Sequence, residues 1–170
     1  NNCAQCHGSD GRGAVGFPNL TDDAWQWGGT EDAVLTTLRN GRNGVMPPQA
    51  AILGSDQAVE ETVAFVRSLS GLEAPADKVA AGKEHYSKVS IACNCPQGQR
   101  NPMLSAPNLT DDEWIHIDGS YPSIVQLVTT GVPEPTEHPG LMLPKGGTNI
   151  SDQDVRDVAA YVWTLSHHGG

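Results

Sequence analysis

The sequence predicts an all-α fold in which one domain plan is used twice in tandem, and three observations support this prediction. Residues 18–25 recur almost unchanged at 107–114, and ordered matches follow at Gly41 and Gly131 and in two closing segments, 64–70 and 160–166. Apolar residues in and before each closing segment are spaced as on one face of a helix. The intervening sequence is rich in Gly and Pro (19 and 12 in the chain), which is typical of loops, and no strand is predicted.

The repeat also predicts the domain boundaries. We expect one domain over residues 1–71, a linker over 72–77 and a second domain over 78–170. In the second domain a predicted helix precedes the segment that corresponds to residues 3–8, so the equivalent helix of the first domain is expected upstream of Asn1.

The two closing helices carry the clearest helical pattern. In the first, 56–69, Val59 and Val63 lie on one face and Ser55 is a suitable N-cap. The segment 151–165 repeats this pattern near the end of the chain.

Three further helices complete the prediction. Two shorter ones, 30–39 and 123–130, each end near a Gly, which is a common C-terminal signal, and 78–88 forms the helix that opens the second domain. Phe65 and Tyr161 hold the same place in the two closing helices, and we expect both to be buried in the core.

The strongest chemical signal is Cys3-Ala-Gln-Cys6-His7. The C-x-x-C-H pattern is the attachment site of a c-type haem, in which the two thiols form thioethers and the imidazole binds the iron. Two alternatives share part of the pattern. A thioredoxin-like C-x-x-C would need a βαβ context, and a zinc site would need a second Cys/His pair at suitable spacing; the sequence offers neither.

Met46 is the predicted second axial ligand of that iron. It follows Gly44 and precedes Pro47 and Pro48, so it lies in a stiff loop and not on an apolar helix face. A thioether opposite a histidine is a common ligand pair of c-type haems. The alternative is that Met46 only fills space in the core.

The second half keeps the scaffold of a haem domain but not its motif. Met142 lies ten residues before Asp152, as Met46 lies ten before Asp56, and we expect Met142 to bind a second iron. At the motif itself, Cys93 can form one thioether, while Ser90, Asn94 and Cys95 replace the expected Cys, His and Gly. No bulky apolar residues have arrived to fill the space of a porphyrin, which favours a second haem. Two explanations of the motif stay open: the site is degenerate, or these letters do not record the residues present.

Composition narrows the classes of function. The formal net charge is −10, which argues against nucleic acid as a partner. An acidic surface suits docking to a basic protein, although it also simply favours solubility.

The sequence has no run of 18 apolar residues, so no membrane span is predicted in it. Aromatic residues make up only 5% of the chain, so a covalently bound porphyrin would add much to two small cores.

The same residues bring a family into view. Cys3–His7 with Gly8-Ser-Asp-Gly11, the segment Gly16-Phe-Pro-Asn-Leu-Thr-Asp-Asp23, and Gly41-Arg-Asn-Gly-Val-Met-Pro47 resemble the dihaem cytochrome c subunit of the cbb3-type cytochrome c oxidases. The second half is similar to that subunit's second haem domain through Ala106-Pro-Asn-Leu-Thr-Asp-Asp112.

This resemblance implies two class I cytochrome c domains that carry haem c. They would lie on the periplasmic side of the bacterial inner membrane, held by a membrane anchor upstream of Asn1. The chain would pass electrons from a soluble cytochrome to the catalytic subunit of the oxidase, among other subunits. It also implies that Cys3 and Cys6 attach haem, that His7 and Met46 bind its iron, and that the Pro18 carbonyl accepts a hydrogen bond from the other ring nitrogen of His7.

Two other functions stay open on sequence grounds. One is a free soluble carrier with one or two haems. The other is an enzyme of the dihaem peroxidase type, which would need an open iron site, and a Met46-ligated iron argues against it. No catalysis is expected from this chain alone.

Overall fold

The computed structural model describes residues 2–91, 94–132 and 141–167, and it confirms that the chain is mostly helical. Within that part, the regular strands are β1 (Arg42–Asn43) and β2 (Leu141–Met142), which pair antiparallel. The sequence pattern predicts neither, because two residues are too few to show the alternation that marks a strand. The helices are α1 (Ala4–His7), α2 (Glu31–Asn40), α3 (Ala50–Leu53), α4 (Asp56–Leu69), α5 (Ala76–Val89), α6 (Tyr121–Thr130) and α7 (Asp152–His167), with 3-10 turns η1 (Pro102–Leu104) and η2 (Pro144–Gly147).

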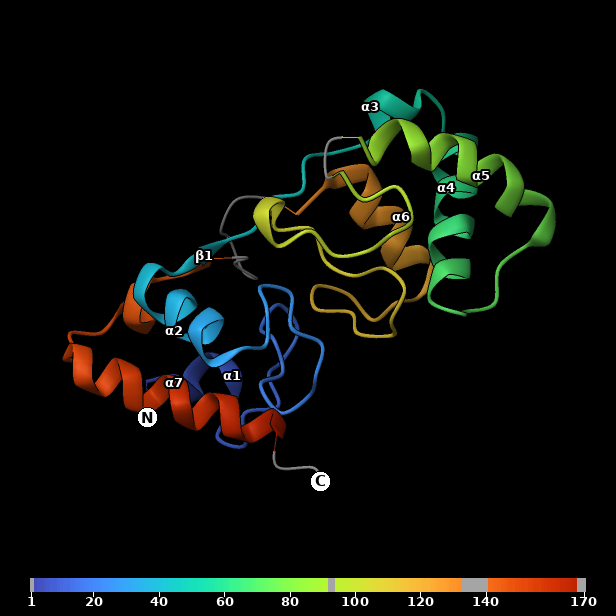
Figure 1. The fold of residues 1–170 in the computed structure, drawn as a ribbon. Helices are drawn as coiled ribbons and strands as arrows, with labels where there is room; N and C mark the ends of the chain where they lie inside the picture. Colours follow the sequence, from blue (N-terminus) through green and yellow to red (C-terminus); the bar gives the residue numbers. More distant parts are fainter. Residues whose placement is uncertain (1, 92–93, 133–140, 168–170) are drawn as a thin grey trace. The chain divides into compact units, whose positions relative to one another are not determined.

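The chain forms two compact units that do not follow the two sequence repeats. Unit 1 joins Asn1–Gly44 to Glu134–Gly170, and unit 2 is Val45–Pro133. These units differ from the predicted domains, 1–71 and 78–170. The closing helix of each repeat packs against helices of the other repeat. Figure 1 shows α7 beside α2 in unit 1, and α4 beside α5 and α6 in unit 2.

The repeat itself gives a physical basis for this exchange. A β-carbon placed on Gly11 would lie 3.4 Å from Leu165 Cδ1, and one placed on Gly98 would lie 2.7 Å from Leu69 Cδ1. Gly11 and Gly98 are equivalent, and so are the two leucines. Because both closing helices present the same contact residues, either helix can cover either loop, and exchanging equivalent elements costs little.

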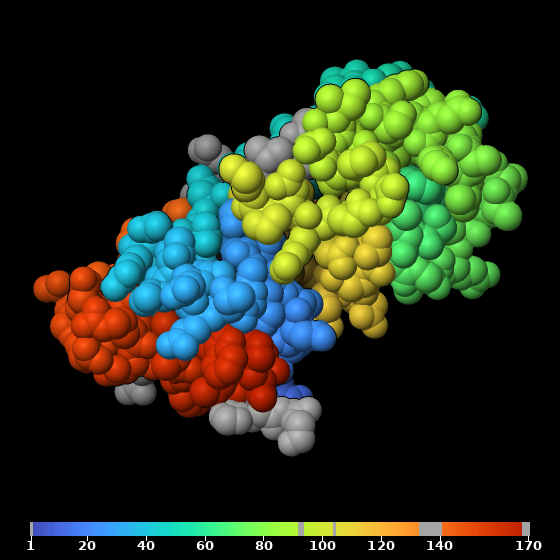
Figure 2. All heavy atoms as spheres, viewed as in Figure 1, coloured from blue at the N-terminus to red at the C-terminus, as the bar shows by residue number. Residues whose placement is uncertain are grey.

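Unit 1 has a small core between α2 and α7. The Thr30 side chain caps α2 by accepting a hydrogen bond from the Ala33 amide (3.2 Å), which fixes where the helix begins. Val34 and Leu38 then face Val155 on α7, which is fully buried. In Figure 2 the red spheres of α7 lie directly against the light-blue spheres of the segment around α2.

Unit 2 has the larger core, built on the packing of α4 against α5. Ser55 caps α4 as predicted, accepting from the Ala58 amide at 3.1 Å. The two helices approach closely at Gly82, where an added β-carbon would lie 1.9 Å from the Glu61 carbonyl oxygen. The Phe65 and Tyr86 rings pack beside this crossing, with their centroids 5.2 Å apart.

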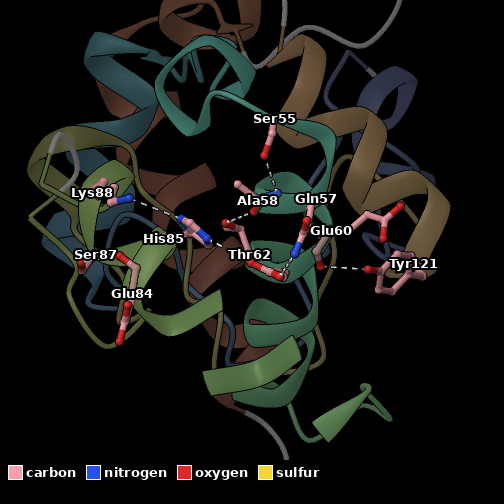
Figure 3. A network of polar contacts seen from close by, with 11 residues as sticks. Ser55, Gln57, Ala58, Glu60, Thr62, Glu84, His85, Ser87, Lys88 and Tyr121 are labelled. Atoms are coloured by element: carbon pink, nitrogen blue, oxygen red, sulfur yellow. Dashed lines mark hydrogen bonds and ion pairs between the residues drawn. The ribbon is translucent and has the colours of Figure 1, made fainter. Parts of the chain in front are cut away.

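Polar contacts join the three longer helices of unit 2 (Figure 3). His85 Nε2 on α5 lies 3.0 Å from the Glu61 carboxylate on α4, and Lys88 Nζ lies 3.4 Å from His85 Nδ1. At the start of α6, the Tyr121 hydroxyl donates to the Glu60 carbonyl oxygen at 2.8 Å. Both ring nitrogens of His85 therefore have a partner on α4 or α5.

The two equivalent aromatic residues of the closing helices have different surroundings. Phe65 is 8% exposed, as predicted, because α5 covers it. Tyr161 is 63% exposed, so the prediction that it is buried is wrong. The reason is that unit 1, in the part that the structure describes, contains no counterpart of α5.

Among the described residues, no helix combines the length and the apolar character that a membrane crossing requires.

Candidate functional site

The first motif forms a single helical turn at the surface of unit 1. Cys3 is the N-cap of α1 and Cys6 lies within it, and the His7 amide donates to the Cys3 carbonyl oxygen at 2.9 Å. Residues three apart on a helix share a face, so the two cysteines lie one above the other. Both are exposed and free, as thioether formation requires.

The His7 ring is held by the carbonyl oxygen of Pro18. Its Nδ1 lies 2.9 Å from that oxygen, which can only accept, so Nδ1 carries the proton. Nε2 is then the unprotonated nitrogen that can bind a metal, and the hydrogen bond fixes the orientation of the ring. The contact implied by the family resemblance is confirmed.

A tight loop brings Pro18 to His7. The Gly13 amide donates to the His7 carbonyl oxygen at 2.8 Å, and a short bridge joins Ala14 to Phe17. Gly13 has φ +72°, and a β-carbon there would lie 2.3 Å from the Phe17 carbonyl oxygen. A side chain at this position is excluded by both conformation and space.

The two candidate methionine ligands are exchanged between the units. Met142 pairs with Arg42 in the two-stranded sheet of unit 1, and it packs against the unit 1 core, as Leu20 and Trp25 also do. Met46 forms a bridge with Val132 in unit 2. The sequence prediction joined Met46 to His7, whereas the structure places His7 and Met142 in one compact unit and Met46 in the other.

Unit 2 repeats the same arrangement around Met46. Met46 packs against the unit 2 core, as Leu109 and Trp114 also do. These two residues are the equivalents of Leu20 and Trp25. The backbone after each Met is also equally close to its partner: β-carbons on Gly41 and Gly131 would each lie 2.2 Å from the carbonyl oxygen of the facing methionine. Both methionine strands are therefore positioned in the same way.

The second motif, residues 90–95, differs from the first at the positions of its haem-attaching cysteine and its histidine. Cys93 lies outside the described residues. Ser90 is buried, Asn94 adopts a left-handed conformation (φ 50°), and Cys95 is buried and disulfide-bonded. The Tyr86 hydroxyl donates to the Cys95 carbonyl oxygen at 3.0 Å, and burial raises the pKa of Tyr86, so this donor stays neutral.

Comparison with known proteins agrees with this geometry. Residues 1–66 match the family described as cytochrome c oxidase, cbb3-type, subunit III. The chain is 40% identical over 171 residues to the cbb3-type cytochrome c oxidase subunit CcoP of Rubrivivax gelatinosus, an alignment that covers 98% of this chain and 52% of that protein. It is 37% identical to the FixP subunit of Azorhizobium caulinodans (96% and 56% covered) and 34% identical to CcoP of Cereibacter sphaeroides (96% and 57% covered).

This chain is a homologue of the cbb3-type cytochrome c oxidase subunits CcoP and FixP. It spans about half the length of these relatives. Its homology and its complete first motif together imply covalently bound haem c.

The residues of unit 1 in this CcoP and FixP homologue fit haem c. They provide two free thiols on one helical turn, an imidazole with a free Nε2, and a thioether in the same unit. The described residues of the second motif do not fit a histidine-ligated haem, because residue 94 carries an amide and not an imidazole.

The sequence identified five residues of the unit 1 site but missed Trp27. The five are Cys3, Cys6, His7, Pro18 and Met142. Arg42 lies over the Trp27 ring, with its guanidinium carbon 4.5 Å from the ring centroid. The sequence did hold a signal for this pair, because Val132, and not an arginine, follows Gly131 at the position equivalent to Arg42.

Proposed function

We propose that this chain transfers electrons through c-type haem as part of a cbb3-type oxidase. The observation that carries the proposal is the His7 imidazole, fixed by the Pro18 carbonyl oxygen in a unit that also holds Cys3, Cys6 and Met142. When bound, haem c supplies an iron that takes up and releases one electron. Cys3 and Cys6 would attach the group, and His7 and Met142 would offer it an imidazole and a thioether as iron ligands.

The ligand set that we propose for unit 1 is His7 and Met142. Equivalent contacts support it, since each methionine pairs with the second residue after a helix of its own unit. Met142 pairs with Arg42 after α2, and Met46 pairs with Val132 after α6. By the same reasoning, Met46 is the ligand that unit 2 would offer to a second haem.

The setting of this electron transfer is also a proposal. The relatives are named as oxidase subunits, so we expect other subunits of such a complex, including the catalytic one, to accept the electrons. The net charge of −10 suits a basic soluble cytochrome as donor. With a donor of this kind, we expect the two units to lie on the periplasmic side of the bacterial inner membrane.

Two methionine variants test this function. Met142→Ala should abolish the near-infrared sulfur-to-iron charge-transfer band of the first haem and slow its oxidation by the oxidase complex at least tenfold. Met46→Ala is the matched control and should leave the band in place. Loss of the band in Met46→Ala, with retention in Met142→Ala, would restore the pairing of His7 with Met46. A protein that binds no haem at Cys3 and Cys6 would contradict the function itself.

A further inference from the structure

Arg42 lies opposite a candidate iron ligand. It belongs to β1, and its cross-strand partner in β2 is Met142. Residues directly opposite on antiparallel strands project on the same side of the sheet, with β-carbons about 4.5–5.5 Å apart. A cationic side chain is thus anchored beside the residue that offers the thioether.

The guanidinium of Arg42 is fixed by neutral groups. Its Nε donates to the Thr37 hydroxyl at 2.9 Å, and its guanidinium carbon lies over the Trp27 ring, 4.5 Å from the ring centroid. Among the residues that the structure describes, no carboxylate lies within ion-pair distance of it. Its positive charge is held in place without being neutralised there.

Unit 2 shows that this charge is not needed to position a methionine strand. Val132 occupies the position of Arg42 there and bridges to Met46 in the same register. Val132 is buried and apolar. The cation is a feature of unit 1, added to a backbone arrangement that both units share.

We propose that Arg42 raises the reduction potential of the haem attached at Cys3 and Cys6. Reduction removes one positive charge from the iron centre, so a fixed cation nearby favours the reduced form. Arginine is the cationic side chain that is effectively always protonated in proteins. It acts as a tuning residue and not as a ligand, and the inference rests on the proposed function, since it requires Met142 to bind that iron.

The test compares three variants of the haem-loaded protein by redox titration of the near-infrared band, which reports only an iron with His and Met ligands. Arg42→Gln should lower the ratio of reduced to oxidised haem at a given solution potential about tenfold, which is about 59 mV for a one-electron couple. Arg42→Lys keeps the charge and should stay within about threefold of wild type. Arg39→Gln removes an exposed charge from the last turn of α2, just before β1, and should change this ratio less than twofold.

Two results in the variants would overturn the inference. One is an equal shift in Arg42→Gln and Arg39→Gln, which would show only a general charge effect. The other is loss of the band in Arg42→Gln, which would make Arg42 a structural support of the Met142 strand. Wild-type protein without the band would contradict the ligand set of the proposed function, and with it this inference.

Discussion

The loops that follow His7 and Asn94 share one construction and differ in the residues that bind a metal. In both, a leucine amide donates to an earlier glycine carbonyl oxygen at 2.7 Å: Leu20 to Gly11, and Leu109 to Gly98. The second loop is longer and contains η1, where Met103 is 92% exposed.

The turns that follow the two prolines are also the same. The Asn19 side-chain oxygen accepts from the amide and the hydroxyl of Thr21, at 2.9 and 2.7 Å. The Asn108 oxygen accepts from the same two groups of Thr110, at 3.2 and 2.8 Å. The comparison shows that the loop is held by its backbone and its asparagine turn, so its shape persists when the histidine is absent.

The largest expected difference between the units concerns the closing helices. Phe65→Ala should lower the free energy of unfolding by about 3–5 kcal/mol, because it leaves a cavity against Tyr86 in a packed core. Tyr161→Ala, at the equivalent exposed position, should cost less than about 1 kcal/mol. Denaturant unfolding followed by circular dichroism measures both. Equal costs would mean that Tyr161 is covered in the protein in solution.

A smaller effect is expected in the first loop. Gly13→Ala should cost about 2 kcal/mol or more, because the new β-carbon meets the Phe17 carbonyl oxygen and the backbone is left-handed. Gly71→Ala is the matched control, with the same φ of +72° but open space around it, and should cost only about 1 kcal/mol. The free energy of unfolding of each variant decides this. If the two costs are equal, the close approach at Gly13 contributes nothing.

The smallest expected effect is the contribution of Asp118, in unit 2, to the pH dependence of stability. Hydrogen bonds from the Ser123 hydroxyl and then from the Ser120 amide lower the pKa of Asp118 from 3.8 to about 2. A carboxylate whose pKa is depressed by folding stabilises the fold above its unfolded pKa, and this contribution disappears as the pH falls from about 4 through 2.

Thermal midpoints measured between pH 5 and pH 2 check this expectation. Asp118→Asn should flatten the acid side of the profile slightly, whereas Asp112→Asn, an exposed control, should leave it unchanged. An Asp118→Asn profile that coincides with wild type would mean that these hydrogen bonds do not persist in solution.

The sequence predicted the parts of this molecule that depend on local pattern. The helix 56–69 with its Ser55 cap was found within its observed bounds, and the implied contact between His7 and Pro18 is present. These features follow from spacing and capping within one short stretch.

The exchange of closing helices could not be predicted in the same way. Met46 and Met142 each precede their helix by ten residues, so the pattern assigns each to its own repeat. When two repeats carry the same contact surface, the sequence does not say which copy covers which. That choice depends on the tertiary contacts of β1 with β2, two residues each and far apart in the chain.

The exchange also sets an order in which the chain can fold as it is synthesised. Unit 2 is one continuous stretch, Val45–Pro133, and its contacts are available once that stretch has been made. Unit 1 must wait, because α2 ends at Asn40 while its partner α7 begins only at Asp152. Throughout the synthesis of the intervening residues, the apolar face of Val34 and Leu38 has no partner from α7, and closing so long a loop slows folding. The later part of the chain therefore completes the earlier motif, and until it does, the uncovered apolar face of α2 is open to aggregation.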